Sequence, residues 1–262
     1  MNQKHFKILK SGVENWNRWR KENPGITPDL SDAYLQGENL RGANLEKADL
    51  WRVYLRKANL HGANLQEADL YEANLREAYL HEAKLYEANL REANLYGANL
   101  QEAKLYGAYL QKTNLQEAKL YGAYLQKAKL QEVNLHGANL QRANLQEADL
   151  YEANLQRANL QEVDFQGANL QWAYLRGADL RKAKFKNTTY GEGVPISKEP
   201  IQITGFTWFI LIFDEHMKIG CEFHSFDEWE NFTDEEIDKM NEGVLTFWNK
   251  NKKKLLAMCK NR

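Results

Sequence analysis

An apolar residue recurs at every fifth position of this chain over more than half of its length. The register runs unbroken from Leu30 to Phe185, with leucine at 30 of its 32 positions and phenylalanine at Phe165 and Phe185. A period of five matches neither the 3.6 residues of an α-helix nor the two residues of a flat strand. A phase kept for so long identifies a repeat, in which every unit presents the same residue to a shared interior.

The residue two places before each leucine is almost always alanine. From Ala33 onward, the exceptions are Val53, Val133 and Val163, which are slightly larger, and Glu38 and Thr113. If four units close a square coil, the leucines and their small companions point inward and nearly fill it. Each buried leucine then contributes about 1.5–3 kcal/mol to folding. We therefore expect a solid interior without a ligand-sized cavity, which argues against an enzyme site inside the repeat.

The units follow the pattern A-(N/D)-L-x-x, as in ANL at 43–45 and 73–75 and ADL at 48–50 and 148–150. In this pattern the sequence resembles the pentapeptide-repeat family. The resemblance implies an all-β solenoid, a right-handed quadrilateral parallel β-helix with one unit per side and about eight coils. It also implies a non-catalytic role, since family members with known roles generally act by binding partners.

The chain divides into three predicted parts. Residues 1–28 are expected to form an N-terminal capping helix, with an amphipathic pattern over residues 3–22 that includes Leu9 and Trp16. We expect this helix to cover the open end of the β-ladder, as natural proteins do with exposed edges. Residues 29–187 are the predicted β-helix.

Residues 188–262 lose the period and predict a small C-terminal α+β module. The run IQITGFTWFILIF predicts a strand over 201–213, DEHMK a turn and IGCEF a second strand, which together form a hairpin. Capping boxes begin at Ser225 and Thr233, and a terminal helix is expected over 244–260.

The same apolar run suggests a hypothesis about how two copies of the chain associate. Phe206, Trp208 and Phe209 lie close together in it. We take them as a candidate homodimer contact of the C-terminal module.

The composition limits which cellular compartment and which kinds of partner we expect for this chain. The 262 residues carry a formal net charge of −1, so no bulk attraction to nucleic acid or to a membrane surface is expected. Two cysteines are too few for a disulfide framework, and no signal peptide or transmembrane run is apparent. We expect a cytoplasmic protein that needs no cofactor and binds another protein.

Charge is nonetheless uneven along the repeat. Residues 61–102 carry a net charge of about −5, residues 103–131 about +4, and residues 132–169 about −4. Tyrosines and lysines gather in and beside the positive segment, and such pairs are common at protein interfaces. The candidate partner-binding residues are Lys84, Tyr86, Lys104, Tyr106, Tyr109, Lys112, Lys119, Tyr121, Tyr124, Lys127 and Lys129.

This cluster has two other interpretations. Cations placed between two acidic segments improve solubility without binding anything. Tyrosines beside lysines also occur where single-stranded nucleic acid stacks, although the near-zero net charge disfavours that partner.

A column of asparagines predicts a structural ladder. Asn74, Asn94, Asn114, Asn134 and Asn154 are spaced by twenty residues, so they stack if one coil holds twenty. Stacked amides can hydrogen-bond along the column.

No catalytic motif is present, and the chain is not expected to be an enzyme. His216, Cys221 and His224, with the distant Cys259, are the only candidate metal ligands that we single out. Cys-x-x-His is an accepted zinc spacing, but half a motif is weak evidence. A buried cysteine and a hydrogen-bonded histidine are the favoured interpretation.

The alternative function is that of a DNA mimic that modulates a type II topoisomerase, as gyrase-protecting relatives do. The resemblance implies the rod-like shape that such a DNA mimic needs. That role depends on a strongly acidic exterior, whereas residues 29–187 hold 21 acids and 20 bases.

Overall fold

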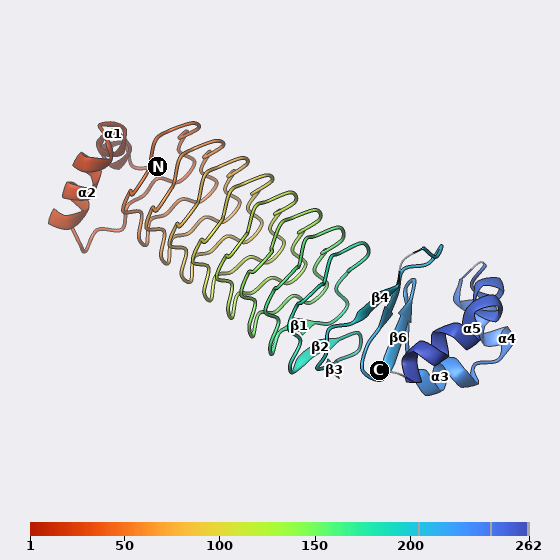
Figure 1. Cartoon of the computed structure of the whole chain (residues 1–262). Helices are drawn as coiled ribbons and strands as arrows, with labels where there is room; N and C mark the ends of the chain where they lie inside the picture. Colours follow the sequence, from red (N-terminus) through yellow and green to blue (C-terminus); the bar gives the residue numbers. More distant parts are fainter. Residues whose placement is uncertain (204, 242, 261–262) are drawn as a thin grey trace. The chain divides into compact units, whose positions relative to one another are not determined.

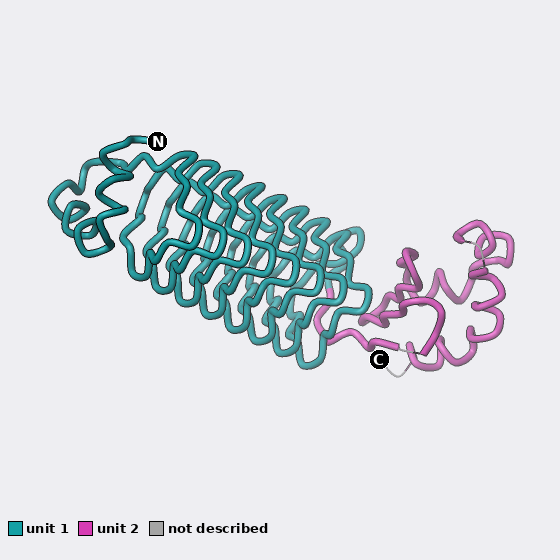
Figure 2. The backbone as a smooth tube through the Cα atoms, turned by 90° about the horizontal axis from the view of Figure 1, so that it is seen from above, with its two compact units in different colours: residues 1–195 teal, residues 196–262 magenta. Residues whose placement is uncertain are grey.

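The computed structural model describes residues 1–203, 205–241 and 243–260. It divides into two compact units, residues 1–195 and residues 196–262 (Figure 2). Residues 188–195 thus belong to the unit that contains the repeat. Each unit is described by itself.

The repeat folds as the expected quadrilateral parallel β-helix, with coils stacked one on another (Figure 1). The residue before each leucine pairs with the residue twenty positions later, as Asn74 does with Asn94, and four such rows run along the stack. The amide of Leu75 donates to the carbonyl of Asn94 at 2.8 Å, and the amide of Asn94 donates to the carbonyl of Ala73 at 2.9 Å. Each coil inside the stack therefore bonds to both of its neighbours through its backbone.

The corners of the coil are tight turns between a leucine and the next alanine. The amide of Ala98 donates to the carbonyl of Leu95 at 3.0 Å, and the second turn residue, Gly97, has φ 63°. A turn of this type needs a positive φ at that position. Charged residues adopt it at other corners, as Glu92 does with φ 59°, and the backbone bonds to adjacent coils hold them there.

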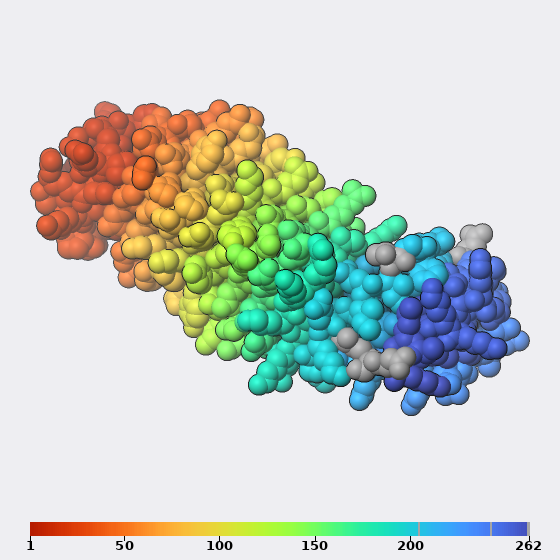
Figure 3. Space-filling view, in the orientation of Figure 1, coloured from red at the N-terminus to blue at the C-terminus, as the bar shows by residue number. Residues whose placement is uncertain are grey.

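The interior of the repeat is filled. Every leucine of the register is at most 2 % exposed. Thr113 is fully buried, and its hydroxyl donates to the carbonyl of Leu90 at 2.7 Å, so this exception to the alanine rule carries no unpaired hydroxyl. On the face shown in Figure 3, the side chains of successive coils form a continuous surface.

The N-terminal segment contains two helices, so the prediction of one helix over residues 3–22 is wrong. Helix α1 spans Gln3–Lys10 and helix α2 spans Val13–Glu22. Gly12 separates them with φ 116°, a conformation that residues with a Cβ rarely adopt. The apolar spacing continues across this break, which is why the sequence pattern conceals it.

Side chains of α2 form, with the backbone of the early repeat, the hydrogen bonds that a preceding coil would form. The Trp16 indole nitrogen donates to the carbonyl of Asn44 at 2.8 Å, and the Asn17 side-chain oxygen accepts the amide of Asn44, also at 2.8 Å. Arg20 donates to the carbonyl of Glu46 at 2.8 Å. The helices thus cover the open ladder end, as expected.

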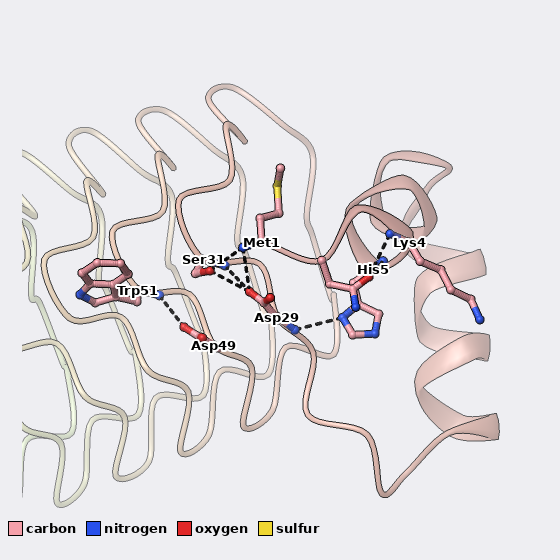
Figure 4. Close-up of polar contacts among 8 residues, drawn as sticks. Met1, Lys4, His5, Asp29, Ser31, Asp49 and Trp51 are labelled. Carbon is pink, nitrogen blue, oxygen red and sulfur yellow. Dashed lines mark hydrogen bonds and ion pairs between the residues drawn. The ribbon is translucent and has the colours of Figure 1, made fainter.

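Figure 4 shows polar contacts around Asp29, at the start of the first coil. The amide of Asp29 donates to Nδ1 of His5 at 3.1 Å, and the Met1 ammonium lies 3.2 Å from the Asp29 carboxylate. Burial alone would raise the pKa of Asp29, but hydrogen bonds from Ser31 and the charge of Met1 outweigh it and lower that pKa. Glu38 also lies in this coil and pairs with Lys10 of α1. This ion pair explains why a glutamate stands at a position where the other coils have alanine.

Three short strands follow the central coils, and the last of them ends at Ile196, the first residue of the second unit. Strand β1 (Asn169–Leu170) pairs in parallel with β2 (Thr188–Tyr190), and β3 (Val194–Ile196) lies beside β2 in the sheet order β1-β2-β3. Strand β2 continues the coil register, because Thr189 pairs with Asn169 twenty residues earlier.

The second unit is α+β, but its strands differ from the predicted hairpin. Strands β4 (Ile201–Ile203), β5 (Ile210–Ile212), β6 (His216–Ile219) and β7 (Glu222–Ser225) form an antiparallel sheet in sequence order. The run 201–213 therefore holds two strands, and most of the predicted turn is strand β6. Alternating burial of Met217 and Ile219 marks β6 as a half-buried strand, a pattern already readable in the sequence.

The helices of this unit begin where the capping boxes predicted. Helices α3 (Phe226–Asn231) and α4 (Asp234–Met240) carry complete capping boxes, and α5 spans Val244–Lys260. Trp229 and Trp248 are buried with ring centroids 5.0 Å apart. The Trp229 indole nitrogen donates to the carbonyl of Met217 at 2.7 Å, which ties α3 to β6.

The filled interior generates one prediction. Replacing Ala98 by leucine should lower the free energy of unfolding by about 1–3 kcal/mol or more, because the added carbons have no space. Thermal unfolding followed by circular dichroism measures the change. Thr113→Ala is the matched control and should cost less, since alanine is the usual residue of that row. Equal stability of Ala98→Leu and wild type would contradict a filled interior.

The N-terminal helices generate a second prediction. Trp16→Ala should destabilise the first coil by about 3–5 kcal/mol, because a fully buried indole and its hydrogen bond to the ladder edge are lost. Hydrogen exchange should become faster in residues 29–48 and stay unchanged in the central coils. Arg18→Ala, on the exposed side of the same helix, should leave the exchange of both regions unchanged.

Candidate protein-interaction surface

Eight of the eleven candidate residues lie in three equivalent segments of consecutive coils. Segments 84–89, 104–109 and 124–129 stack directly, because Lys84 pairs with Lys104, Lys104 with Tyr124, and Tyr109 with Lys129. They cover parts of two adjacent walls and the corner between them. We call this surface the tyrosine–lysine face; it comprises Lys84, Tyr86, Lys104, Tyr106, Tyr109, Tyr124, Lys127 and Lys129.

Three tyrosines of this face are largely open to solvent. Tyr106 is 40 % exposed, Tyr109 44 % and Tyr124 48 %. Gly107 follows Tyr106 at the corner, where a Cβ would meet the Glu87 side chain at 3.4 Å.

The lysines make the face positive. Lys84, Lys104 and Lys129 have no carboxylate within ion-pair distance among the residues that the structure describes. Lys127 is different, since its ammonium lies 3.6 Å from Glu147 and 5.8 Å from the centroid of the Tyr106 ring. Hydrogen bonding to Tyr106, followed by the charge of Glu147, raises the pKa of Lys127 and keeps it protonated.

The other three candidates lie elsewhere on the coil. Lys112 is at the next corner and pairs with Glu132 at 3.8 Å. The Tyr121 hydroxyl accepts a hydrogen bond from Arg142 at 2.9 Å. Lys119 is exposed on another wall. The structure therefore does not gather all eleven residues into one surface.

Ion pairs between adjacent coils explain part of the charge pattern. Lys112, Lys127 and Arg142 each pair with a glutamate twenty residues further on. Exposed pairs of this kind each contribute little to stability. For Lys112, Lys127 and Arg142, these pairs support a role in solubility and stability. They do not explain Lys84, Lys104 and Lys129, which have no carboxylate partner among the described residues.

The asparagine column makes mostly local hydrogen bonds. The Asn94 side-chain oxygen accepts the amide of Tyr96 at 3.1 Å, and Asn114 and Asn134 accept the amide two residues on in the same way. Within the predicted column, a bond between stacked amides joins Asn154 to Asn134 at 3.2 Å. The asparagines thus mainly support the corners of the coil.

The candidate metal ligands of the second unit do not form a cluster. His216 begins β6, and Cys221 follows the other end of that strand, so roughly 13 Å of strand separates them. The His216 ring stacks on Phe223 at 5.1 Å, and His224 lies edge-on to Trp229 at 5.3 Å. Burial lowers the pKa of His216 and raises that of Cys259 to about 11.

The candidate dimer residues are partly used within the second unit. Phe206 lies edge-on to Phe247, with ring centroids 5.5 Å apart, and Trp208 packs against Gly220. Phe206, Trp208 and Phe209 are each half-buried. The dimer contact stays a prediction.

Sequence reasoning missed one group of ligand atoms. His61, His81 and Glu82 bring three of them within 4.8 Å of one another, and no other group of this kind occurs among the described residues. The two histidines are twenty residues apart at the same corner, so reading the sequence in columns of twenty would have found the pair.

None of the described helices has the length and apolar character needed to cross a membrane.

Comparison with known proteins agrees with the repeat. The family profile described as pentapeptide repeats matches several overlapping segments between residues 29 and 189. The comparison with curated proteins found no match.

Several solved structures are similar to the chain. HetL from the cyanobacterium Nostoc sp. strain PCC 7120, a protein involved in heterocyst differentiation regulation, is 36% identical over 65% of this chain and 81% of its own, with a TM-score of 0.44. The plasmid-mediated fluoroquinolone resistance protein QnrB1 is 20% identical over 61% and 91%, with a TM-score of 0.41. A protein of the Arabidopsis thaliana thylakoid lumen is 25% identical over 50% and 71%, with a TM-score of 0.28.

Because the family profile matches more than half of the residues, in the register that the leucines set, the chain belongs to the pentapeptide-repeat family.

Proposed function

We propose that this protein is a non-catalytic interaction scaffold that binds another protein through its tyrosine–lysine face. The observation that carries the proposal is the combination of three exposed tyrosines with lysines that have no carboxylate partner. Tyrosine supplies contact area and a hydroxyl at low entropy cost, and such residues are enriched in interfaces.

The rigid support of the face favours binding. Each of its three segments is bonded through the backbone to the coils on either side, as in the bonds of Leu105 to Tyr124 and of Tyr124 to Ala103. A surface that is already ordered loses little conformational entropy on association. The filled interior leaves the exterior as the surface on which the repeat can act.

Charge points to the kind of partner. Lys84, Lys104 and Lys129 add three positive charges, and none of them forms an ion pair with a carboxylate of the described residues. A protein that presents aspartate and glutamate beside apolar groups is complementary to this face, and opposite charges would also speed its association.

The DNA-mimic function is not proposed. QnrB1 is 20% identical, a likeness that extends to the fold alone. The repeat holds nearly equal numbers of acids and bases, and cross-coil pairs such as Arg142 with Glu162 neutralise acids on its surface. A uniform acidic exterior is therefore absent from the described surface.

The binding prediction compares two triple variants. Tyr106→Ser, Tyr109→Ser and Tyr124→Ser together should reduce capture of the cognate partner at least about tenfold, which corresponds to a loss of about 1.4 kcal/mol. The control changes Tyr34, Tyr79 and Tyr174, which are also exposed but lie outside the face. Affinity capture with quantitative mass spectrometry measures both variants against wild type, after nuclease treatment.

A second arm tests the charge. Glu147→Gln releases Lys127 from its ion pair and should strengthen capture of the same partner at low salt. A photo-crosslinking residue at position 106 should join that partner, whereas one at position 34 should not. Equal capture by the two triple variants would contradict the proposal, and a signal lost with nuclease would point to nucleic acid.

The C-terminal module carries a separate prediction about assembly. If Phe206, Trp208 and Phe209 form a homodimer contact, the mass in solution should be that of a dimer and should fall to that of a monomer in Trp208→Ser. Light scattering at high concentration measures it. A monomeric mass of the wild type would contradict the dimer.

A further inference from the structure

Two histidines on adjacent coils face each other at the corner that precedes the wall of Lys84 and Lys104. His61 and His81 stack with ring centroids 5.1 Å apart and planes inclined by 7°. Their Nδ1 atoms are 3.2 Å apart, and Nδ1 of His81 is 3.9 Å from a carboxylate oxygen of Glu82. Three atoms that can bind a metal thus converge from two coils.

The separation of the two nitrogens suits one metal ion. Two nitrogens bound to a single zinc ion at tetrahedral geometry lie about 3.3 Å apart, given zinc–nitrogen bonds of about 2.0–2.1 Å. Without an ion, one Nδ1 must donate a hydrogen to the other, because two lone pairs repel at this distance.

We propose that His61, His81 and Glu82 bind one divalent transition-metal ion, with zinc as the best fit to two imidazoles and a carboxylate. Imidazole ligands suit zinc, copper and nickel. Three protein ligands leave at least one position for water, as in open zinc sites. The ion links two consecutive coils.

The surroundings admit an ion and its water. The histidines line a surface pocket of about 440 Å³ together with Asn59 and Gln101, whose amides can hydrogen-bond bound water. At Gly62, next to His61, nothing lies within 4 Å of the place a Cβ would occupy. Lys57 also lines the pocket, but its ammonium pairs with Glu77 at 3.3 Å, which offsets its repulsion of a cation.

The ladder holds the two ligand-bearing corners in register. The amide of Gly62 donates to the carbonyl of His81 at 2.9 Å. The amide of His61 donates to the side chain of Asn59 at 3.1 Å. Because the backbone is ordered before the ion arrives, binding requires only side-chain adjustment.

Isothermal titration of the full chain with Zn²⁺, after removal of metals by a chelator, tests the site. We expect one ion per chain, and His61→Gln and His81→Gln should each weaken binding by about tenfold or more. Glu82→Gln should weaken it as well. Zn²⁺ should raise the melting temperature of the wild type and have a smaller effect on the two histidine variants.

Two controls separate this site from other ligands. His136→Gln removes a half-buried histidine of another corner, and Cys221→Ser removes the exposed thiol of the second unit. Both should bind Zn²⁺ as the wild type does. Circular dichroism confirms that each variant keeps the fold. Unchanged affinity in the double variant His61→Gln/His81→Gln, or loss of binding in Cys221→Ser, would overturn the proposal.

Discussion

The parallel backbone ladder between coils is the interaction on which the rest of this structure depends. Within the stack, leucine amides donate forward to the next coil and the residues before the leucines donate back to the previous one, at 2.7–3.1 Å. The ladder is possible only if every unit has the same length, because one inserted residue would move leucine out of the interior. Four leucines and their small companions then fill each coil, so backbone pairing and apolar burial require the same period of five.

The ladder also creates a problem at its first coil, which the N-terminal helices solve. A parallel stack leaves unpaired amides and carbonyls at each end, and buried unpaired groups are costly. Trp16, Asn17 and Arg20 supply donors and an acceptor to Asn44 and Glu46, in place of a preceding coil. Side chains of the cap therefore make the hydrogen bonds that the backbone of a preceding coil would otherwise make.

Fixed stacking turns the exterior into columns whose neighbours are set by sequence spacing. Residues twenty apart lie about 4.8 Å apart at the backbone, whatever their chemistry. The same rule brings Lys104 beside Tyr124 and His61 beside His81. The core constrains only two residues in five, so the other three are free to vary and to carry surfaces of different character. A binding face and a metal site can thus occupy the same stack without affecting its interior.

The sequence by itself determined the period, the inward rows and the helix starts at Ser225 and Thr233, because each depends on local spacing or local hydrogen bonds. The four-sided coil was implied by the resemblance to a known family. The sequence did not determine the break at Gly12 or the division of the candidate binding residues. These features depend on which side chains come into contact in the folded chain. Tyr121 illustrates the difference, since its hydroxyl is taken by Arg142 from the next coil, a contact decided by side-chain direction in three dimensions. A repeat of fixed length makes the backbone predictable, whereas contacts between exposed side chains depend on rotamers that only the tertiary structure selects.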